Sequence, residues 1–168
     1  MKQRIRISAL TVLAMMALIS AGLAFPAQSR ANGATQISGI GTYAAPGACL
    51  DPVGGGADYI LSFTGDLSGC DYTFVETSRC SEGGAYYESG TETFVGTYNG
   101  QFGTFRTNYV FTAKYRDCPN FVGEIAGRCQ HPIMAGSGTG GFDGVRGRFD
   151  IRDDVEAGNF PYRGHLAF

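Results

Sequence analysis

The chain has 168 residues, of which 26 are glycine and five are cysteine, and it contains no tryptophan. Its first 31 residues hold four of the 13 Lys and Arg and none of the 15 Asp and Glu, so residues 32–168 carry a formal charge of −6. This charge argues against nucleic acid, or an anionic membrane surface, as a partner.

The N-terminal stretch has the three parts of a secretory signal peptide. A basic start is followed by an apolar run over 7–24 and by small residues that place a cleavage site after Ala31, with cleavage after Ala24 as the alternative. The apolar run is also close to the roughly 18 residues of a membrane-spanning candidate. We predict a signal peptide over 1–31, a single domain over 32–168 free of the membrane, and a secreted or periplasmic location.

Beyond the leader, no ten-residue stretch has helical periodicity. Alternating apolar and polar residues instead recur between Gly, Asn and Asp, which is typical of strands joined by tight turns. Successive strands are predicted at 37–43, 58–67, 71–79, in a hairpin over 91–115, and at about 125–135, 145–153 and 161–168.

The hairpin over 91–115 is the clearest of these elements. Asn99-Gly100 marks its turn, because both residues tolerate the positive φ of a type I′ turn. Glu92, Phe94 and Tyr98 share one face before the turn, and the alternation continues after it with Phe105, Tyr109, Phe111 and Tyr115 on one face. One face is therefore predicted to be core and the other solvated.

The stretch GSGTGG, residues 136–141, spells the G-x-G-x-x-G fingerprint of dinucleotide-binding folds. That fingerprint requires a buried strand before it and a helix after it. Here an alternating strand follows instead. We interpret these glycines as a bulge or sharp bend, and no nucleotide or other cofactor is expected.

Eight antiparallel strands, each with one apolar face, close most economically into a small barrel, because closure removes the exposed edges. The predicted fold class is therefore all-β, an eight-stranded antiparallel up-and-down β-barrel. A two-sheet sandwich is the competing architecture.

Cysteines in an exported chain are expected to form disulfides. No C-x-x-C occurs and the two histidines are far apart, so no metal site is expected. In an up-and-down barrel the strand ends alternate between rims, which favours Cys118–Cys129 and Cys49–Cys80 and leaves Cys70 as a free thiol. The alternative pairs Cys80 with Cys118 and Cys49 with Cys129.

Carboxylates on apolar faces are the candidate catalytic groups. Glu92 shares a face with Phe94 and Tyr98, and Glu76 shares one with Tyr72 and Phe74. Two carboxylates in one lumen would raise the pKa of at least one of them, and the pair could act as acid and base. The alternative is that each lies in water at a barrel end or is hydrogen-bonded to a tyrosine.

Aromatic residues and one histidine are the candidate ligand-binding groups. His131 is in register with Ile125 and Ile133, which points it inward. The predicted ligand-binding residues are Tyr72, Tyr98, Tyr109 and His131. The alternative is that these side chains simply fill a small barrel.

Three stretches, FTGDLSG (63–69), ETFVGTYNGQFGTF (92–105) and GSGTGGFDGVRGRF (136–149), resemble the bacterial allene-oxide-cyclase-like barrels, a group that includes a domain family of unknown function and is related to the dirigent proteins. The resemblance spans most of 36–168 and consists of turn and bend signatures, so it supports a fold more than a function. It implies a barrel with a cavity, often in a homo-oligomer, that acts without a cofactor.

Two functions are compatible with these observations. The first is an exported, disulfide-stabilised barrel that binds a small hydrophobic or aromatic ligand, or serves as a structural module, without catalysis. The alternative is a cofactor-independent isomerase or cyclase that holds a hydrophobic ligand in the lumen, with Glu92 as acid or base. The size of the lumen and the burial of its carboxylates distinguish the two.

Overall fold

The structure is a computed structural model that describes residues 33–50 and 55–168. The predicted signal peptide and the predicted cleavage sites lie outside the described residues. In the part that is described, the fold is all-β, and no helix is long and apolar enough to cross a membrane. The strands are β1 Thr35–Tyr43, β2 Tyr59–Gly65, β3 Leu67–Cys80, β4 Ala85–Tyr98, β5 Gln101–Asp117, β6 Val122–Pro132, β7 Thr139–Gly140, β8 Arg146–Arg152 and β9 Phe160–Ala167.

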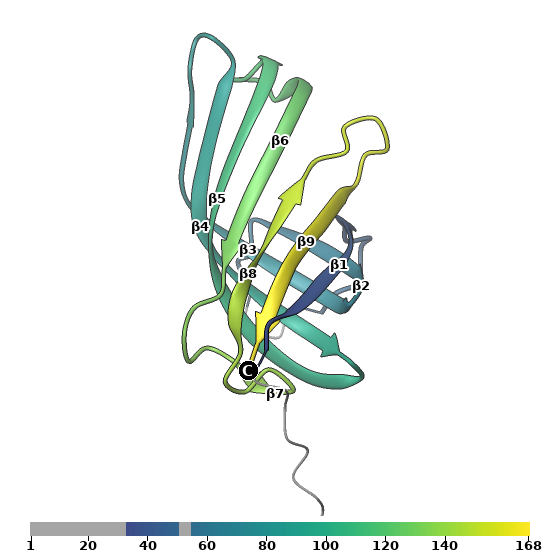
Figure 1. Ribbon diagram of the computed structural model, residues 1–168. Helices are drawn as coiled ribbons and strands as arrows, with labels where there is room; N and C mark the ends of the chain where they lie inside the picture. The colour runs from purple at the N-terminus through teal and green to yellow at the C-terminus, as the bar shows by residue number, and fades with distance from the viewer. Residues whose placement is uncertain (1–32, 51–54) are drawn as a thin grey trace, which may run out of the picture. The chain divides into compact units, whose positions relative to one another are not determined.

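Eight of these strands form a closed antiparallel barrel, which confirms the predicted fold class (Figure 1). The strands pair in the order β4-β3-β2-β1-β9-β8-β6-β5, in which the first strand, β1, pairs with the last, β9. The pairing of β4 with β5 closes the ring. The short strand β7 is an addition that pairs with β5 at Gly103 and Thr104. Closure leaves no open edge among the eight strands.

The β4–β5 hairpin confirms the turn predicted at Asn99-Gly100. Both residues have positive φ, 50° and 73°, and the strands pair without interruption from Tyr98–Gln101 to Ala85–Lys114. A type I′ turn matches the twist of the strands, which explains why the register is fixed over such a length. β4 alternates buried and less buried residues along its whole length, as the sequence predicts.

Aromatic side chains fill one end of the lumen. The core there includes Phe63, Phe94, Phe105, Phe149 and Tyr162, each at most 1% exposed. Their rings contact one another at centroid distances between 5.0 and 6.4 Å. This end of the barrel is therefore packed solid, and it leaves no space for a ligand.

The glycine-rich stretch forms part of this packing. Residues 133–145 cross the filled end, and they insert Phe142, which is fully buried against Phe94, Tyr98 and Phe105. A Cβ added at Gly138 would lie 1.9 Å from the carbonyl oxygen of Phe142, so the loop needs glycine there. The bend leads into β8, which agrees with the interpretation of GSGTGG as a structural turn.

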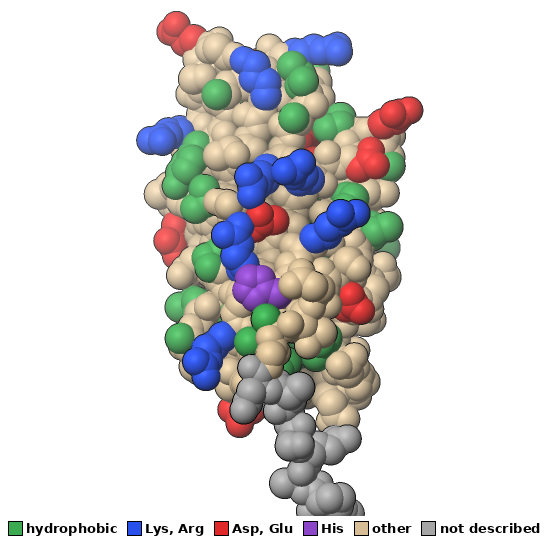
Figure 2. Space-filling view, in the orientation of Figure 1, with side chains coloured by type: hydrophobic (Ala, Val, Ile, Leu, Met, Phe, Trp, Pro, Cys, Tyr) green, Lys and Arg blue, Asp and Glu red, His purple; other side chains and the backbone are tan. Residues whose placement is uncertain are grey.

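Arginines gather on the outer face of β6, β8 and β9, in the front of the space-filling view (Figure 2). Arg128 lies opposite Arg152, and Arg163 lies opposite Asp150. Asp150 accepts ion pairs from Arg128 and Arg148 at 2.6 and 2.5 Å. Partial burial raises the pKa of Asp150, but these hydrogen bonds bring it below its ordinary value. The row is a solvated face with local charge pairing.

Candidate functional site

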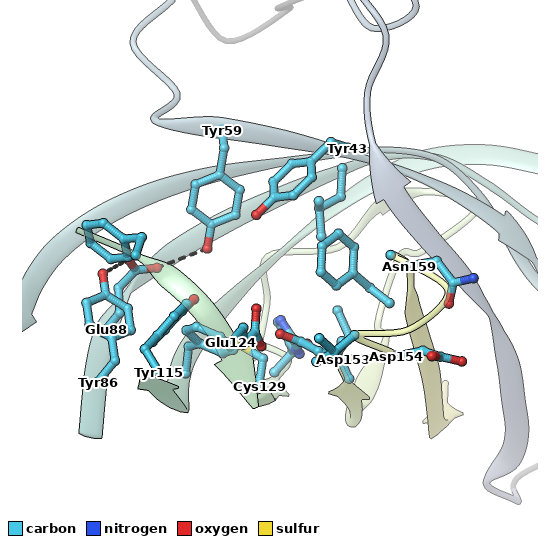
Figure 3. A pocket seen from close by; sticks show the side chains of 18 of the residues that line it. Tyr43, Tyr59, Tyr86, Glu88, Tyr115, Glu124, Cys129, Asp153, Asp154 and Asn159 are labelled. Carbon is cyan, nitrogen blue, oxygen red and sulfur yellow. Dashed lines mark hydrogen bonds between the residues drawn. The ribbon is translucent and has the colours of Figure 1, made fainter. Parts of the chain in front are cut away.

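A cavity of about 410 Å³ occupies the other end of the lumen, where the strands splay open (Figure 3). Seven aromatic side chains line it, namely Tyr43, Tyr59, Tyr86, Phe111, Tyr115, Phe121 and Phe160. Five carboxylic side chains line it as well, namely Glu88, Glu92, Glu124, Asp153 and Asp154. A concave, largely aromatic cavity of this volume is typical of a small-molecule site.

Glu88 lies on β4 and accepts three tyrosine hydroxyls. Tyr59 and Tyr109 donate to Oε1 at 3.0 and 2.9 Å, and Tyr86 donates to Oε2 at 2.5 Å. Burial, together with the hydrogen bond to Glu88, raises the pKa of Tyr86 to about 12. The pKa of Tyr109 rises for the same reasons. The carboxylate thereby holds these hydroxyls as protonated donors in the cavity wall.

The floor of the cavity contains a buried carboxylate and a buried imidazole. Glu92 accepts a hydrogen bond from Thr107 at 2.7 Å, and its Oε1 lies 3.4 Å from Nε2 of His131. The side chains of Glu92 and His131 are 2% and 1% exposed. The imidazole stacks on Phe149 at 4.4 Å between centroids, so its position is fixed by packing as well as by charge.

The charges of the floor are coupled. Burial lowers the pKa of His131, but the negative charge of Glu92 and the hydrogen bond between them raise it above the ordinary value overall. Asp71, fully buried on β3, has its pKa raised well above the usual range, first by burial and then by Glu92. Glu92 thus favours the protonated form of His131 and of Asp71, because its negative charge lies close to both.

Two more carboxyls meet nearer the opening. Glu124 on β6 and Asp153, just after β8, hydrogen-bond to each other. Burial, that hydrogen bond and the charge of Glu124 raise the pKa of Asp153 to about 7. Asp153 is therefore partly protonated near neutral pH, because burial and the neighbouring charge both disfavour its ionised form. Figure 3 shows Tyr115 beside them and Tyr43 across the opening.

The predicted site residues divide between the two ends and the two faces of the barrel. Glu92 and His131 point inward and line the cavity, as their alternation suggests. Tyr109 also faces the lumen, where it is buried, its ring stacks on His131 and its hydroxyl donates to Glu88. Tyr98 lies at the filled end, where its ring stacks on Phe168.

Tyr72 and Glu76 were expected to face the lumen, and this is wrong. Asp71 and Thr73 take the inward positions opposite Phe94 and Glu92. Tyr72 is buried on the outer face, where its hydroxyl donates to the carbonyl oxygen of Leu50 in the loop after β1. Glu76 is exposed at a bulge in the β3–β4 register, between Val75 and Thr77. A shift by one residue exchanges the two faces of a strand.

The disulfide pairing also differs from the expected one. The bridges are Cys49–Cys70 and Cys80–Cys118, so Cys118–Cys129 and Cys49–Cys80 do not form, and Cys129, not Cys70, is the unpaired cysteine of the described residues. The loop after β1 does not stay at the rim but folds over the outer face of β2 and β3 to reach Cys70. Half of the alternative pairing, Cys80–Cys118, is correct.

Cys129 is unpaired because its side chain points into the lumen. It lies opposite the inward residues Phe111 and Ile151, is 7% exposed and lines the cavity. Burial, with the charge of Glu92 next, raises the pKa of its thiol well above the ordinary value. A thiol in this state is an unreactive part of the wall rather than a nucleophile.

Sequence reasoning missed Glu88, Glu124 and Asp153. Glu88 has the same parity as Glu92 and would have been found by extending the hairpin strand toward its start. Glu124 escapes any parity argument, because the β5–β6 register shifts between Lys114 and Tyr115. The same shift leaves Ile125 exposed, although alternation with His131 places it inward. Within residues 33–50 and 55–168, no group of three or more His, Cys, Asp or Glu side chains is arranged to hold a metal ion.

No protein-family model matches the chain, and no curated protein matches it.

Proposed function

We propose that this protein is an exported, non-catalytic barrel of the allene-oxide-cyclase-like type that binds a small hydrophobic or aromatic molecule in its lumen. One observation carries the proposal: the lumen is packed solid at one end and open at the other, around a cavity of about 410 Å³ with aromatic walls. A barrel that served only as a structural module would gain stability by filling this space.

Export is supported by two independent features. The N-terminal stretch has the pattern of a signal peptide, and the two disulfides are of the kind that persist in the periplasm or outside the cell. Backbone pairing closes the strands around the cavity, and the Cys80–Cys118 bridge joins the end of β3 to the chain just after β5. The cavity is therefore a preformed part of a rigid wall, which reduces the entropic cost of binding.

The test is native mass spectrometry of the protein purified from its own host, before and after denaturation. A small molecule that is released on denaturation supports a lumenal ligand. The matched variants are Cys129→Phe, which places a ring in the cavity, and Cys129→Ser, which keeps its volume. We expect Cys129→Phe to lose the bound molecule and Cys129→Ser to retain it. Retention of the same molecule by Cys129→Phe would place the ligand elsewhere and contradict the proposal.

A second candidate, a cofactor-independent isomerase or cyclase, is favoured by the Glu92–His131 pair on the cavity floor. A buried carboxylate paired with an imidazole can remove a proton from a ligand carbon and return one elsewhere. Such a transfer exchanges protons with solvent. The molecule recovered from the protein would then gain deuterium when incubated with it in D₂O, and Glu92→Gln would abolish that gain. No uptake above the protein-free rate would leave binding as the function.

A further inference from the structure

The wall of the cavity is strongly unbalanced in charge. Among the described residues that line it, five carry a carboxyl group and none is Lys or Arg. The one imidazole, His131, is already engaged with Glu92 at 3.4 Å. The remaining carboxyls therefore have no cationic partner in the wall. A preformed cavity with this imbalance favours a ligand that brings positive charge.

The upper part of the cavity is suited to a cationic head group. Glu124 and Asp153 approach each other there, so closely that a Cβ added at Gly127 would lie 2.6 and 2.2 Å from their oxygens. Tyr115 and Tyr43 are near enough to this pair for its negative charge to raise the pKa of both phenols. Carboxylates combined with aromatic rings are the surroundings in which proteins bind substituted ammonium groups.

The middle of the cavity is apolar. Phe111, Cys129 and Ile151 lie side by side on β5, β6 and β8, in direct register, and Leu61 lines the same cavity from β2. Below them come Glu92 and His131, and above them Glu124 and Asp153. An elongated ligand would thus meet apolar walls along its body and carboxylates at the open end.

We propose that the ligand is a hydrophobic amine in its ammonium form, with the cationic head beside Glu124 and Asp153 and the apolar body between Phe111, Ile151 and Leu61. This inference rests on the proposed binding function and specifies its ligand class. A bound ammonium group would supply the positive charge that the cavity wall lacks beside this carboxyl pair. A carboxylate ligand would instead add a third negative group to the opening.

Three probes of nearly equal shape separate the contributions of charge and of apolar contact: phenethylammonium, 2-phenylethanol and 3-phenylpropionate. Their dissociation constants are measured by calorimetry or by NMR titration at about pH 8, above the pKa of Asp153 of about 7. We expect phenethylammonium to bind at least about tenfold tighter than the alcohol, and the carboxylate to bind most weakly. Added salt should reduce the preference, because it screens partly exposed charges.

Glu124→Gln and Glu156→Gln form a matched pair of variants. Both remove one negative charge near the opening, but Glu156 is exposed and does not line the cavity. Glu124→Gln should weaken the binding of phenethylammonium by about fivefold or more and leave the dissociation constant of 2-phenylethanol within about twofold. Glu156→Gln should change neither dissociation constant.

Each outcome decides a separate question. The inference that the ligand is an amine is wrong if 2-phenylethanol binds as tightly as phenethylammonium, or if Glu124→Gln weakens the binding of both probes equally. The proposed binding of an aromatic molecule in the lumen would still hold. If none of the three probes binds at concentrations up to about 10 mM, the lumen does not take molecules of this size, and both the inference and the proposed function fail.

Discussion

Replacing Phe142 with alanine would remove the side chain with which the glycine-rich loop closes the filled end of the barrel. The ring is 0% exposed, and its centroid lies 5.7 Å from that of Phe94, 6.4 Å from that of Tyr98 and 5.0 Å from that of Phe105. Large-to-small changes at such sites cost about 3–5 kcal/mol, from lost burial and from the cavity that remains. The surrounding rings belong to paired strands and can collapse little, so we expect a loss of about 4 kcal/mol.

Urea denaturation of the oxidised protein measures this loss as a change in the free energy of unfolding. Phe142→Leu is the control, because it keeps most of the apolar volume and should cost less than about 1.5 kcal/mol. The slope with urea should stay the same in both variants if only the folded state is affected. The cavity lies at the other end of the lumen, so ligand affinity should change little. A loss below about 1 kcal/mol for Phe142→Ala would refute the packing described for residues 133–145.

Two further predictions concern the opening and the disulfides. Burial and Glu124 raise the folded-state pKa of Asp153 to about 7, above an unfolded value near 3.9, so its stabilising effect is complete below about pH 4 and is lost as the pH rises through about 7. Because Asp153 is partly exposed, we discount the full effect: between pH 5 and 8, urea titrations should show the free energy of unfolding of Asp153→Asn falling by about 1–2 kcal/mol less than that of the wild type. Equal losses in the two proteins would show that folding does not raise the pKa of Asp153. Cys80 and Cys118 enclose a separation of 38 residues, so replacing both with serine should cost about 4 kcal/mol in the same assay, and an unchanged midpoint would exclude the bridge.

Period-two alternation predicted much of this fold, because an antiparallel barrel of short connections leaves little else to decide. The hairpin around Asn99-Gly100 fixes its own register, and every inward residue predicted along it, from Glu92 to Tyr115, does face the lumen. His131 follows from the same parity. The predicted closure into a barrel follows from the apolar face of each strand, which the alternation of residues indicates.

The same reasoning fails where both faces of a strand are covered. Along β3, Tyr72 looks like a core residue and Asp71 looks like a surface one. The loop after β1 is fastened over the outer face by the Cys49–Cys70 bridge and buries Tyr72, while the lumen at this level is polar and accepts Asp71. The pattern of polar and apolar residues cannot give the register of such a strand, because here the apolar residue faces outward and the polar residue faces the lumen.

Bulges set the other limit to prediction. Alternation can be followed along a strand only until one strand gains a residue relative to its partner, and no local sequence signal marks the shifts beside Glu76 and Tyr115. Both shifts lie toward the open end, where Glu124 and Asp153 meet. The part of the barrel that carries the candidate site is therefore the part whose geometry depends most on tertiary pairing.

The inward orientation of Cys129 has a consequence for how the chain acquires its covalent bonds. Five cysteines can be joined in many wrong ways, and exchange continues for as long as a thiolate can reach a bridge. Closure of the barrel removes Cys129 from that exchange, because the wall then surrounds it and its thiol stays protonated. We therefore expect the two bridges of the closed barrel, Cys49–Cys70 and Cys80–Cys118, to be protected from reshuffling by this thiol.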